Sequence, residues 1–303
     1  VLFFCIEDSY RRRVFFNYER RIRLRSSPEK VFEYFASVRS PDGELLMTHA
    51  DLMRAVVPVF PPSGSSLVRD GSLRGERPPG ELICPPSKFF MLFDIDEDGF
   101  ISFPEYIFFV TLLSVPDSDI SAAFKMFDRD NDGEIDREEF RKVMKLMRAK
   151  HRQGVAHRDG RRSGFKVEDS VENGGLLQFF FGKDGKNRLQ LVEFERFIRD
   201  LHKEIIKLEF EHYDYQSHGT ISAKDFALSM VAAADMKHIN QYLDRIDDMT
   251  NDPALSNIRI TRNEFWSFVE LRRKLHPLAL AMCSYGEVYG LLTKTDFERA
   301  ASH

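Results

Sequence analysis

Two twelve-residue segments of this chain share one arrangement of acidic residues, and this arrangement restricts the fold more than any other feature. Each segment has acids at positions 1, 3, 5 and 12, glycine at position 6 and isoleucine at position 8. The first occupies residues 94–105 and the second residues 128–139. Oxygens at alternate positions can surround one hard cation, and glycine permits the sharp bend that this requires.

The spacing is that of the EF-hand calcium loop, in which side chains, one backbone carbonyl and a bidentate glutamate supply the ligands. In the first loop we expect ligands from Asp94, Asp96, Asp98, the carbonyl of Phe100, Ser102 and Glu105. In the second loop we expect ligands from Asp128, Asp130, Asp132, the carbonyl of Glu134, Asp136 and Glu139. The alternative is a pair of solvated acidic turns, but two full matches in tandem make it improbable. The sequence therefore predicts two Ca²⁺ sites.

A helix-start signal accompanies each loop. Position 9 precedes the acid at position 12 by three residues, which is the spacing of a capping box. One pattern recurs seven times: an apolar residue, a polar cap, an acid three residues after the cap and then a large apolar residue. The acids that end these copies are Asp51, Glu105, Glu139, Glu193, Asp225, Glu264 and Asp296. Such a repeat predicts an all-α fold of tandem EF-hands, both calcium-binding and degenerate.

EF-hands work in pairs because the short strand of each loop needs a partner. The intervals between the seven acids are 54, 34, 54, 32, 39 and 32 residues. The short intervals suggest that the hands ending at residues 105 and 139 form one pair, those ending at 193 and 225 a second, and those ending at 264 and 296 a third. The copy ending at Asp51 is the weakest, and a chance match is its alternative reading.

Five of the seven copies are not expected to bind calcium well. Residues 182–193 have glycine at position 1 and cations at positions 5 and 7, which oppose calcium binding. Residues 214–225 keep Asp214 at position 1, but His218 occupies position 5 and the shorter Asp225 ends the loop. We expect weak calcium binding at most in this Asp214 loop.

The copies at residues 253–264 and 285–296 keep only the helix start. We expect them to be structural, either as partners for neighbouring hands or as surfaces for another protein.

The composition allows a sizeable core, since the chain is 43% hydrophobic and contains 28 phenylalanines. Aromatic residues precede three of the loops at equal spacing, which is a core pattern: Phe90 and Phe93, Phe124 and Phe127, Phe210 and Tyr213. The net charge of −4 gives no indication of nucleic-acid binding. The three cysteines do not form a disulfide framework, and no run of apolar residues is long enough to cross a membrane.

These signals divide the chain into five regions. We expect a basic N-terminal domain with a Pro- and Gly-rich loop at residues 1–87, followed by a calcium-binding pair at residues 88–148 and an Arg-rich linker at residues 149–175. A degenerate pair at residues 176–235 and further degenerate hands at residues 236–303 complete the chain. The chain begins at Val1 without a methionine and its end falls near a helix, so we expect both ends to be trimmed from a longer precursor.

Four segments carry a specific resemblance, namely "FFNYERRIRLRSSPEKVFEYFASV" (15–38), "FDIDEDGFISFPEYIFF" (93–109), "AAFKMFDRDNDGEIDREEF" (122–140) and "FFFGKDGKNRLQLVEFERFIRDL" (179–201). In this order they resemble the mitochondrial calcium uptake proteins, the EF-hand gatekeepers of the mitochondrial calcium uniporter. The intact first loop resembles the plant or protist branch. The family has a further calcium-binding hand that lies C-terminal to this chain.

The resemblance implies a regulatory subunit that inhibits calcium uptake at low calcium and releases the inhibition when calcium binds. It implies a location in the mitochondrial intermembrane space, peripheral to the inner membrane. It also implies two kinds of partner, the uniporter pore subunit and a second copy in a homodimer or higher oligomer. In the family, the motif that matches Tyr18, Arg21 and Arg23 faces an acidic ring at the pore entrance. Without the resemblance, these residues would be read as a solvated basic helix.

Other functions remain open at the level of sequence. The chain has no phosphate-binding glycine loop, nucleophile motif or histidine metal cluster, so an enzyme is not expected. A calcium buffer would keep most of its hands intact. An EF-hand regulatory subunit of another complex, such as a phosphatase or an oxidase, is the strongest alternative, because only the N-terminal segment argues against it.

Overall fold

The computed structural model describes most of the chain, with gaps. The described residues are 8–60, 62, 87, 89–94, 97–115, 119–153, 175–234, 238–249, 253–289, 293–295 and 298. Most of the Pro- and Gly-rich loop, the central part of the predicted Arg-rich linker, Cys5 and Cys84 lie outside these residues, and the side chain of Cys283 is not described.

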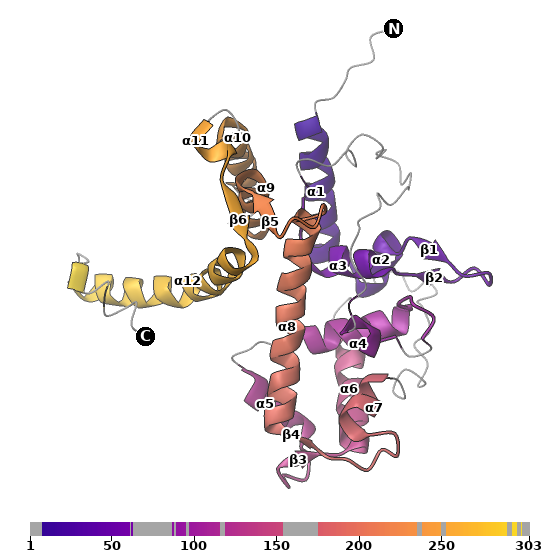
Figure 1. Cartoon of the computed structure of the whole chain (residues 1–303). Helices are drawn as coiled ribbons and strands as arrows, with labels where there is room; N and C mark the ends of the chain where they lie inside the picture. The colour runs from indigo at the N-terminus through magenta and orange to yellow at the C-terminus, as the bar shows by residue number, and fades with distance from the viewer. Residues whose placement is uncertain are drawn as a thin grey trace.

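Helices dominate the described residues, and the strands are two or three residues long, as the all-α prediction requires (Figure 1). The N-terminal half contains α1 (Asp8–Arg25), α2 (Pro28–Phe35), β1 (Val38–Arg39), β2 (Leu45–Leu46), α3 (His49–Val56), the short 3-10 helix η2 (Phe90–Leu92), α4 (Phe103–Leu113), α5 (Ile120–Phe127), β3 (Glu134–Ile135) and α6 (Arg137–Gln153). The C-terminal half contains α7 (Gly175–Phe181), β4 (Leu189–Gln190), α8 (Leu191–Tyr213), β5 (Thr220–Ser222), α9 (Ala223–Ala233), α10 (Ile239–Met249), α11 (Pro253–Ser256), β6 (Arg259–Thr261) and α12 (Arg262–Tyr289).

The predicted helix starts are confirmed for every copy except the one ending at Asp296, which is outside the described residues. Ser27 caps α2 and Pro28 occupies its first turn, where proline lacks an N–H that would otherwise be unsatisfied. Capping boxes begin α3, α4 and α8. The copy ending at Asp51, the weakest in sequence, is therefore a real helix start. Local capping chemistry survives in these hands even where the calcium ligands have been lost.

The predicted pairing of the hands is wrong. β3 pairs with β4, which joins the second calcium loop to the degenerate loop 182–193. β5 pairs with β6, which joins the Asp214 loop to the copy ending at Glu264. Met47 forms an isolated bridge with Ile101, which joins the copy ending at Asp51 to the first calcium loop. The two calcium loops therefore belong to different pairs, each with a degenerate partner.

The long inserts explain the error. In each of the first two pairs, a long insert separates the two partner hands in the sequence. The two calcium loops are closer to each other in the sequence than either is to its partner, although they belong to different pairs. α8 shows the consequence, since it is both the exit helix of loop 182–193 and the entry helix of the Asp214 loop. A helix of this length spans about 34 Å. It thus separates the β3–β4 pair from the β5–β6 pair, as Figure 1 shows.

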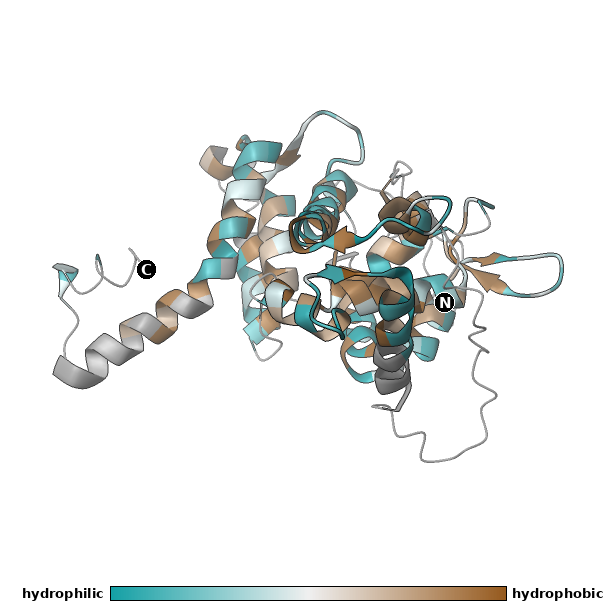
Figure 2. Cartoon of the chain, turned by 90° about the horizontal axis from the view of Figure 1, so that it is seen from below, coloured by the Kyte–Doolittle hydropathy of each residue, from teal (hydrophilic) through white to brown (hydrophobic). Residues whose placement is uncertain are grey.

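The core follows the predicted aromatic pattern. All six aromatic residues that precede the loops are buried: Phe90, Phe93, Phe124, Phe127, Phe210 and Tyr213. Phe127, Phe140 and Phe194 come from three helices and lie in ring contact. In Figure 2 hydrophobic and hydrophilic residues alternate along the helices of the packed centre.

Hydrogen bonds connect the N-terminal region to α8. The Nε2 of His212 donates to the carbonyl oxygen of Phe60 at 2.7 Å, and the amide of Phe60 donates to the hydroxyl of Tyr213 at 3.1 Å. The ring of Phe60 also stacks on Phe16 of α1, with centroids 3.8 Å apart. These contacts hold α1 against the central helix.

The C-terminal region departs from the prediction in one further respect. α12 continues to Tyr289, so residues 285–289 are helical rather than the start of a loop. This copy has no acids at positions 1 and 5 to wrap an ion, and helix is the simpler local structure. Residues 290–292, which lead to its helix start, lie outside the described residues. Among the described helices, none has the length and apolar character needed to cross a bilayer.

α6 also continues to Gln153, into the predicted linker at residues 149–175. The domain boundaries given above are otherwise a prediction.

Candidate calcium sites

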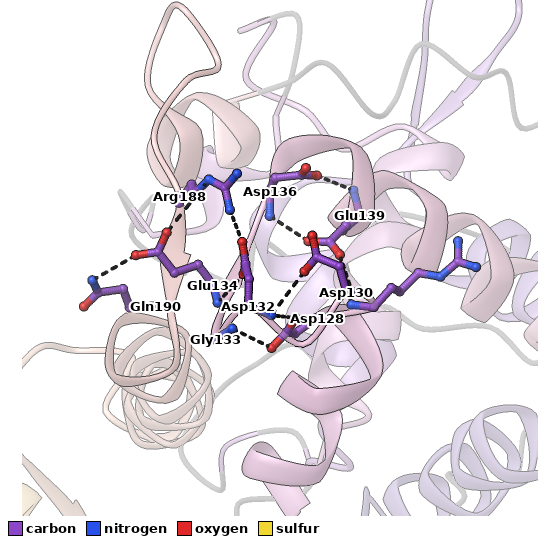
Figure 3. A network of polar contacts seen from close by, with 10 residues as sticks. Asp128, Asp130, Asp132, Gly133, Glu134, Asp136, Glu139, Arg188 and Gln190 are labelled. Carbon is purple, nitrogen blue, oxygen red and sulfur yellow. Dashed lines mark hydrogen bonds and ion pairs between the residues drawn. The ribbon is translucent and has the colours of Figure 1, made fainter.

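The second calcium loop brings three of its predicted ligands together. Carboxylate oxygens of Asp128, Asp130 and Glu139 all lie within 4.8 Å of one another (Figure 3). Asp128 ends α5, and Glu139 lies in the first turn of α6, so the loop between two helices folds its first and last acids toward each other. Three convergent carboxylates are the hard oxygen donors that Ca²⁺ prefers.

The backbone of this loop has the bends predicted for it. Gly133 at position 6 has a φ of 89°, in the left-handed region that glycine adopts without strain. Its amide donates to Oδ2 of Asp128 at 3.1 Å. Asn131 at position 4 also has a positive φ of 57°. The Asp128 carboxylate thus accepts hydrogen bonds from amides on the far side of the loop, and these bonds fix the curvature of the loop.

Glu139 already points into the loop. Its Oε1 accepts from the amides of Arg129 and Asp130 at 2.9 and 3.3 Å, and its Oε2 accepts from the amide of Asp136 at 3.1 Å. The contact is reciprocal, because Oδ1 of Asp136 accepts a hydrogen bond from the amide of Glu139 at 2.8 Å. This is the capping box expected from the sequence. The helix start and the twelfth ligand position are therefore set by the same contacts.

Asp132, a predicted ligand, faces a cation from the neighbouring loop. Arg188 of the degenerate loop 182–193 forms an ion pair with its carboxylate, and Nε of Arg188 lies 3.8 Å from Oε2 of Glu134 (Figure 3). The hydrogen bond to Asp132 raises the pKa of the exposed Arg188. Nε2 of Gln190 also donates to Oε1 of Glu134 at 3.4 Å. Sequence reasoning missed Arg188 because the wrong hands were paired.

The first calcium loop has the same framework. The amide of Gly99, which has a φ of 84°, donates to Oδ2 of Asp94 at 2.9 Å. Oδ1 of Asp98 accepts from the amide of Phe100 at 2.7 Å. The amide and hydroxyl of Ser102 both donate to Oε2 of Glu105, at 2.7 and 2.8 Å. Asp96 lies outside the described residues.

The degenerate loops differ in how much of this framework they keep. In the Asp214 loop the amides of His218 and Gly219 donate to the Asp214 carboxylate at 2.8 and 2.7 Å, and Ser217 and Gly219 have positive φ. This backbone matches the two calcium loops. Loop 182–193 has its positive φ values at Gly182 and Gly185 instead, at positions 1 and 4. The Asp214 loop therefore keeps the loop shape without the full ligand set. Loop 182–193 has lost both the loop shape and the full ligand set.

The predicted partner-binding residues of α1 lie in different environments. Tyr18 is 42% exposed and Arg21 is exposed. The guanidinium of Arg21 lies 5.7 Å from the centroid of the Tyr18 ring. The buried face of the same helix carries Phe16 and Ile22. Tyr18 and Arg21 are therefore accessible to a partner on the solvent side of α1.

Arg23 is a structural residue in this conformation. Its side chain is 8% exposed and forms an ion pair of 3.0 Å with Glu19. Its Nε donates to the carbonyl oxygen of Arg54 at 2.6 Å, and its guanidinium covers the ring of Phe35 at 4.8 Å. Glu19 also pairs with Arg54 of α3. Burial lowers the pKa of Arg23 and the charge of Glu19 opposes this change. The prediction that all three residues face a partner thus does not fit the position of Arg23.

Comparison with known families confirms the two loops as EF-hands. A family model described as EF hand matches residues 87–110, and one described as EF hand domain matches residues 119–147. These ranges contain the two loops that have complete ligand patterns. Calcium is therefore the cofactor of these hands.

Whole-chain relatives identify the family. The Arabidopsis thaliana protein named "Calcium uptake protein, mitochondrial" is 62% identical over 299 residues, covering 99% of this chain and 60% of that protein. The chain belongs to the mitochondrial calcium uptake protein family. The Homo sapiens protein named "Calcium uptake protein 1, mitochondrial" is 34% identical over 303 residues, covering 97% of this chain and 62% of that protein. The chain thus spans about 60% of the length of these relatives.

A solved structure shares the arrangement of the helices. The calcium-binding state of EFHA2 matches with a TM-score of 0.57 at 25% identity, covering 91% of this chain and 85% of that one. The resemblance seen in the sequence to the mitochondrial calcium uptake proteins is therefore confirmed, and so is the EF-hand fold class. The relatives are named as mitochondrial calcium uptake proteins, and neither name is that of an enzyme.

Proposed function

We propose that this chain is the calcium-sensing part of a non-catalytic regulator of the mitochondrial calcium uniporter. It inhibits uptake at low calcium and releases the inhibition when calcium binds. The observation that carries the proposal is the combination of two complete calcium loops with 62% identity to a mitochondrial calcium uptake protein. A pure buffer is less well supported, because each complete loop is paired with a loop whose ligand pattern is incomplete.

The calcium ligands follow the two complete loops. In the first loop the ligands are the carboxylates of Asp94, Asp96 and Asp98, the carbonyl of Phe100, Ser102 and Glu105. In the second they are the carboxylates of Asp128, Asp130 and Asp132, the carbonyl of Glu134, Asp136 and Glu139. Three carboxylates already converge in the second loop, which supports this set.

The switch acts through the helices that leave the loops. Glu105 lies in the first turn of α4 and Glu139 in the first turn of α6. Ions bound in the two loops would take these glutamates as ligands and change the angles of α4 and α6 to their neighbours. β3 is paired with β4, which leads directly into α8, so a change at the second loop reaches the central helix. Arg20 of α1 donates to the carbonyl oxygen of Ala234, which links the N-terminal helix to the C-terminal end of α9.

The partner surface lies on the exposed side of α1. Tyr18 and Arg21 contact the acidic entrance of the pore subunit, because a guanidinium pairs bidentately with carboxylates. Arg23 acts indirectly by holding α1 against Phe35 and Arg54. The site of action is the intermembrane space, where the protein is peripheral to the inner membrane and forms a homodimer or higher oligomer.

A binding experiment tests this function. The chain is immobilised and incubated with detergent-solubilised uniporter pore subunit, with chelator or with calcium. We expect capture with chelator and reduced capture with calcium, and we expect Arg21→Ala to weaken capture without changing calcium binding. Arg199→Ala is the matched control, because Arg199 is an exposed arginine on α8, away from the proposed surface. No capture under either condition would favour a regulatory role in another complex.

A further inference from the structure

The degenerate loop 182–193 places a cation on a ligand residue of its partner. Arg188 forms an ion pair with Asp132, which is position 5 of the second calcium loop, and lies near the Glu134 carboxylate at position 7. Both carboxylates are on the calcium loop and Arg188 is on the other member of the pair. The contact therefore joins a hand with an incomplete ligand pattern to a hand with a complete one.

The strand pairing explains why Arg188 reaches this position. Ile135 is opposite Leu189 and Glu134 is opposite Gln190 in the antiparallel β3–β4 ladder. The same register continues to place Arg188 beside Asp136, a further predicted ligand position. Position 7 of an EF-hand loop contributes its backbone carbonyl to the ion, so its side chain is free to extend outward. An arginine at this position can therefore span the ladder to the other loop.

We propose that Arg188 is a tethered competitor for calcium and sets the calcium affinity of the Asp128–Glu139 hand. Its guanidinium pairs with the carboxylate of Asp132. Calcium needs the same carboxylate, so the two cations compete for Asp132. A positive charge beside the loop also repels the incoming divalent ion. The degenerate hand thus raises the calcium concentration at which its partner responds.

This proposal gives loop 182–193 a role in sensing as well as in structure. The backbone ladder of β3 and β4 does not involve the Arg188 side chain, so the two hands stay paired when calcium arrives. What changes is the side-chain link, because Arg188 is released from Asp132. Calcium binding in the second calcium loop therefore frees the Arg188 side chain of loop 182–193.

The test measures calcium affinity in a chain with one active hand. The parent carries Glu105→Gln, which removes the bidentate ligand of the first loop, and calorimetry then reports the second loop. We expect Arg188→Gln to tighten calcium binding about three- to tenfold, as loss of an exposed ion pair and of a nearby like charge predicts. Arg199→Gln is the control, since it removes an equal charge from an exposed ion pair within α8 and should leave the affinity unchanged.

A spectroscopic readout separates competition from a general effect of charge. In the parent, the NMR signal of the Arg188 Nε–H should shift on addition of calcium, whereas that of Arg199 should stay in place. Unchanged affinity in Arg188→Gln would overturn the proposal. Weaker binding would overturn it too, because it would mean that Arg188 holds Asp132 in its ligand position.

The proposal rests on the ligand set proposed for residues 128–139, and the two can fail separately. Glu139→Lys in the same parent should abolish the measured binding. If the parent binds no calcium, or if Glu139→Lys binds as the parent does, the ligand set is wrong. If the parent binds calcium and loses it with Glu139→Lys, but Arg188→Gln has no effect, only the role of Arg188 is wrong.

Discussion

Met47 and Ile101 exchange two backbone hydrogen bonds of 2.8 Å each, although the Pro- and Gly-rich segment lies between them in the chain. Met47 belongs to the weakest of the seven copies and Ile101 to the first calcium loop. The bridge gives this calcium loop a degenerate hand as its partner. Since β3 and β4 repeat the arrangement for the second calcium loop, each sensor loop is supported by a degenerate one.

This pairing predicts where calcium slows amide exchange. Calcium at the first loop should slow hydrogen exchange at the amide of Met47, because that amide donates to Ile101 within the loop. In Glu105→Lys the effect at Met47 should disappear, whereas calcium-dependent slowing at Leu189, the partner of the second loop, should remain. Exchange measured by mass spectrometry or NMR would show this. An effect of Glu105→Lys at Leu189 instead would contradict the pairing.

The number of bound ions should follow the terminal glutamates. Glu105→Lys and Glu139→Lys should each reduce the bound calcium from two ions per chain to one, because each replaces two ligand oxygens with a repelling charge. The double variant should bind none at the affinity of these sites. Calorimetric titration gives the stoichiometry. Two ions bound to the double variant with unchanged affinity would place the sites elsewhere, and the Asp214 loop would be the next candidate.

Arg23 and Arg21 should differ in their effect on stability. Arg23→Ala should lower the free energy of unfolding by about 3 kcal/mol, because it leaves the buried Glu19 with one partner fewer and removes the contact with Phe35. Arg21→Ala should change it by less than about 0.5 kcal/mol, since Arg21 is exposed. Urea denaturation without calcium measures both. Equal effects would argue against separate structural and partner-binding roles.

Two buried groups on α8 should give opposite pH dependences. Burial lowers the pKa of His212 to about 4, so below pH 6.5 the unfolded chain takes up a proton that the folded chain does not, and stability falls as the pH drops toward 4. Burial raises the pKa of Glu209 to about 7, so above pH 4.5 the unfolded chain loses a proton that the folded chain keeps, and stability falls as the pH rises toward 7.

Each contribution is about 3 kcal/mol over its full range, so the two nearly cancel between pH 4.5 and 6.5. Glu209→Gln should therefore make stability rise with pH in this window, and His212→Gln should make it fall. Chemical denaturation of both variants and the parent at several pH values, without calcium, measures the difference. Parallel pH profiles for the three proteins would show that these groups are not linked to folding.

The sequence alone determined the features that depend on neighbouring residues. The calcium loops, their glycine bends and the helix starts at Ser102 and Asp136 were all predicted correctly, because the contacts that make them span at most a dozen residues. The burial of the aromatic residues before each loop also followed from spacing, since these positions face the inside of every hand.

Which hand pairs with which depends on the tertiary structure. Position 8 is apolar in every copy, so each short strand could pair with any other, and local sequence holds no preference. The same holds for Arg188, which reaches Asp132 only once β3 and β4 are paired, and for Arg23, which is buried by α2 and α3. Such contacts join segments far apart in the chain, and their free energy depends on the packing of the whole molecule.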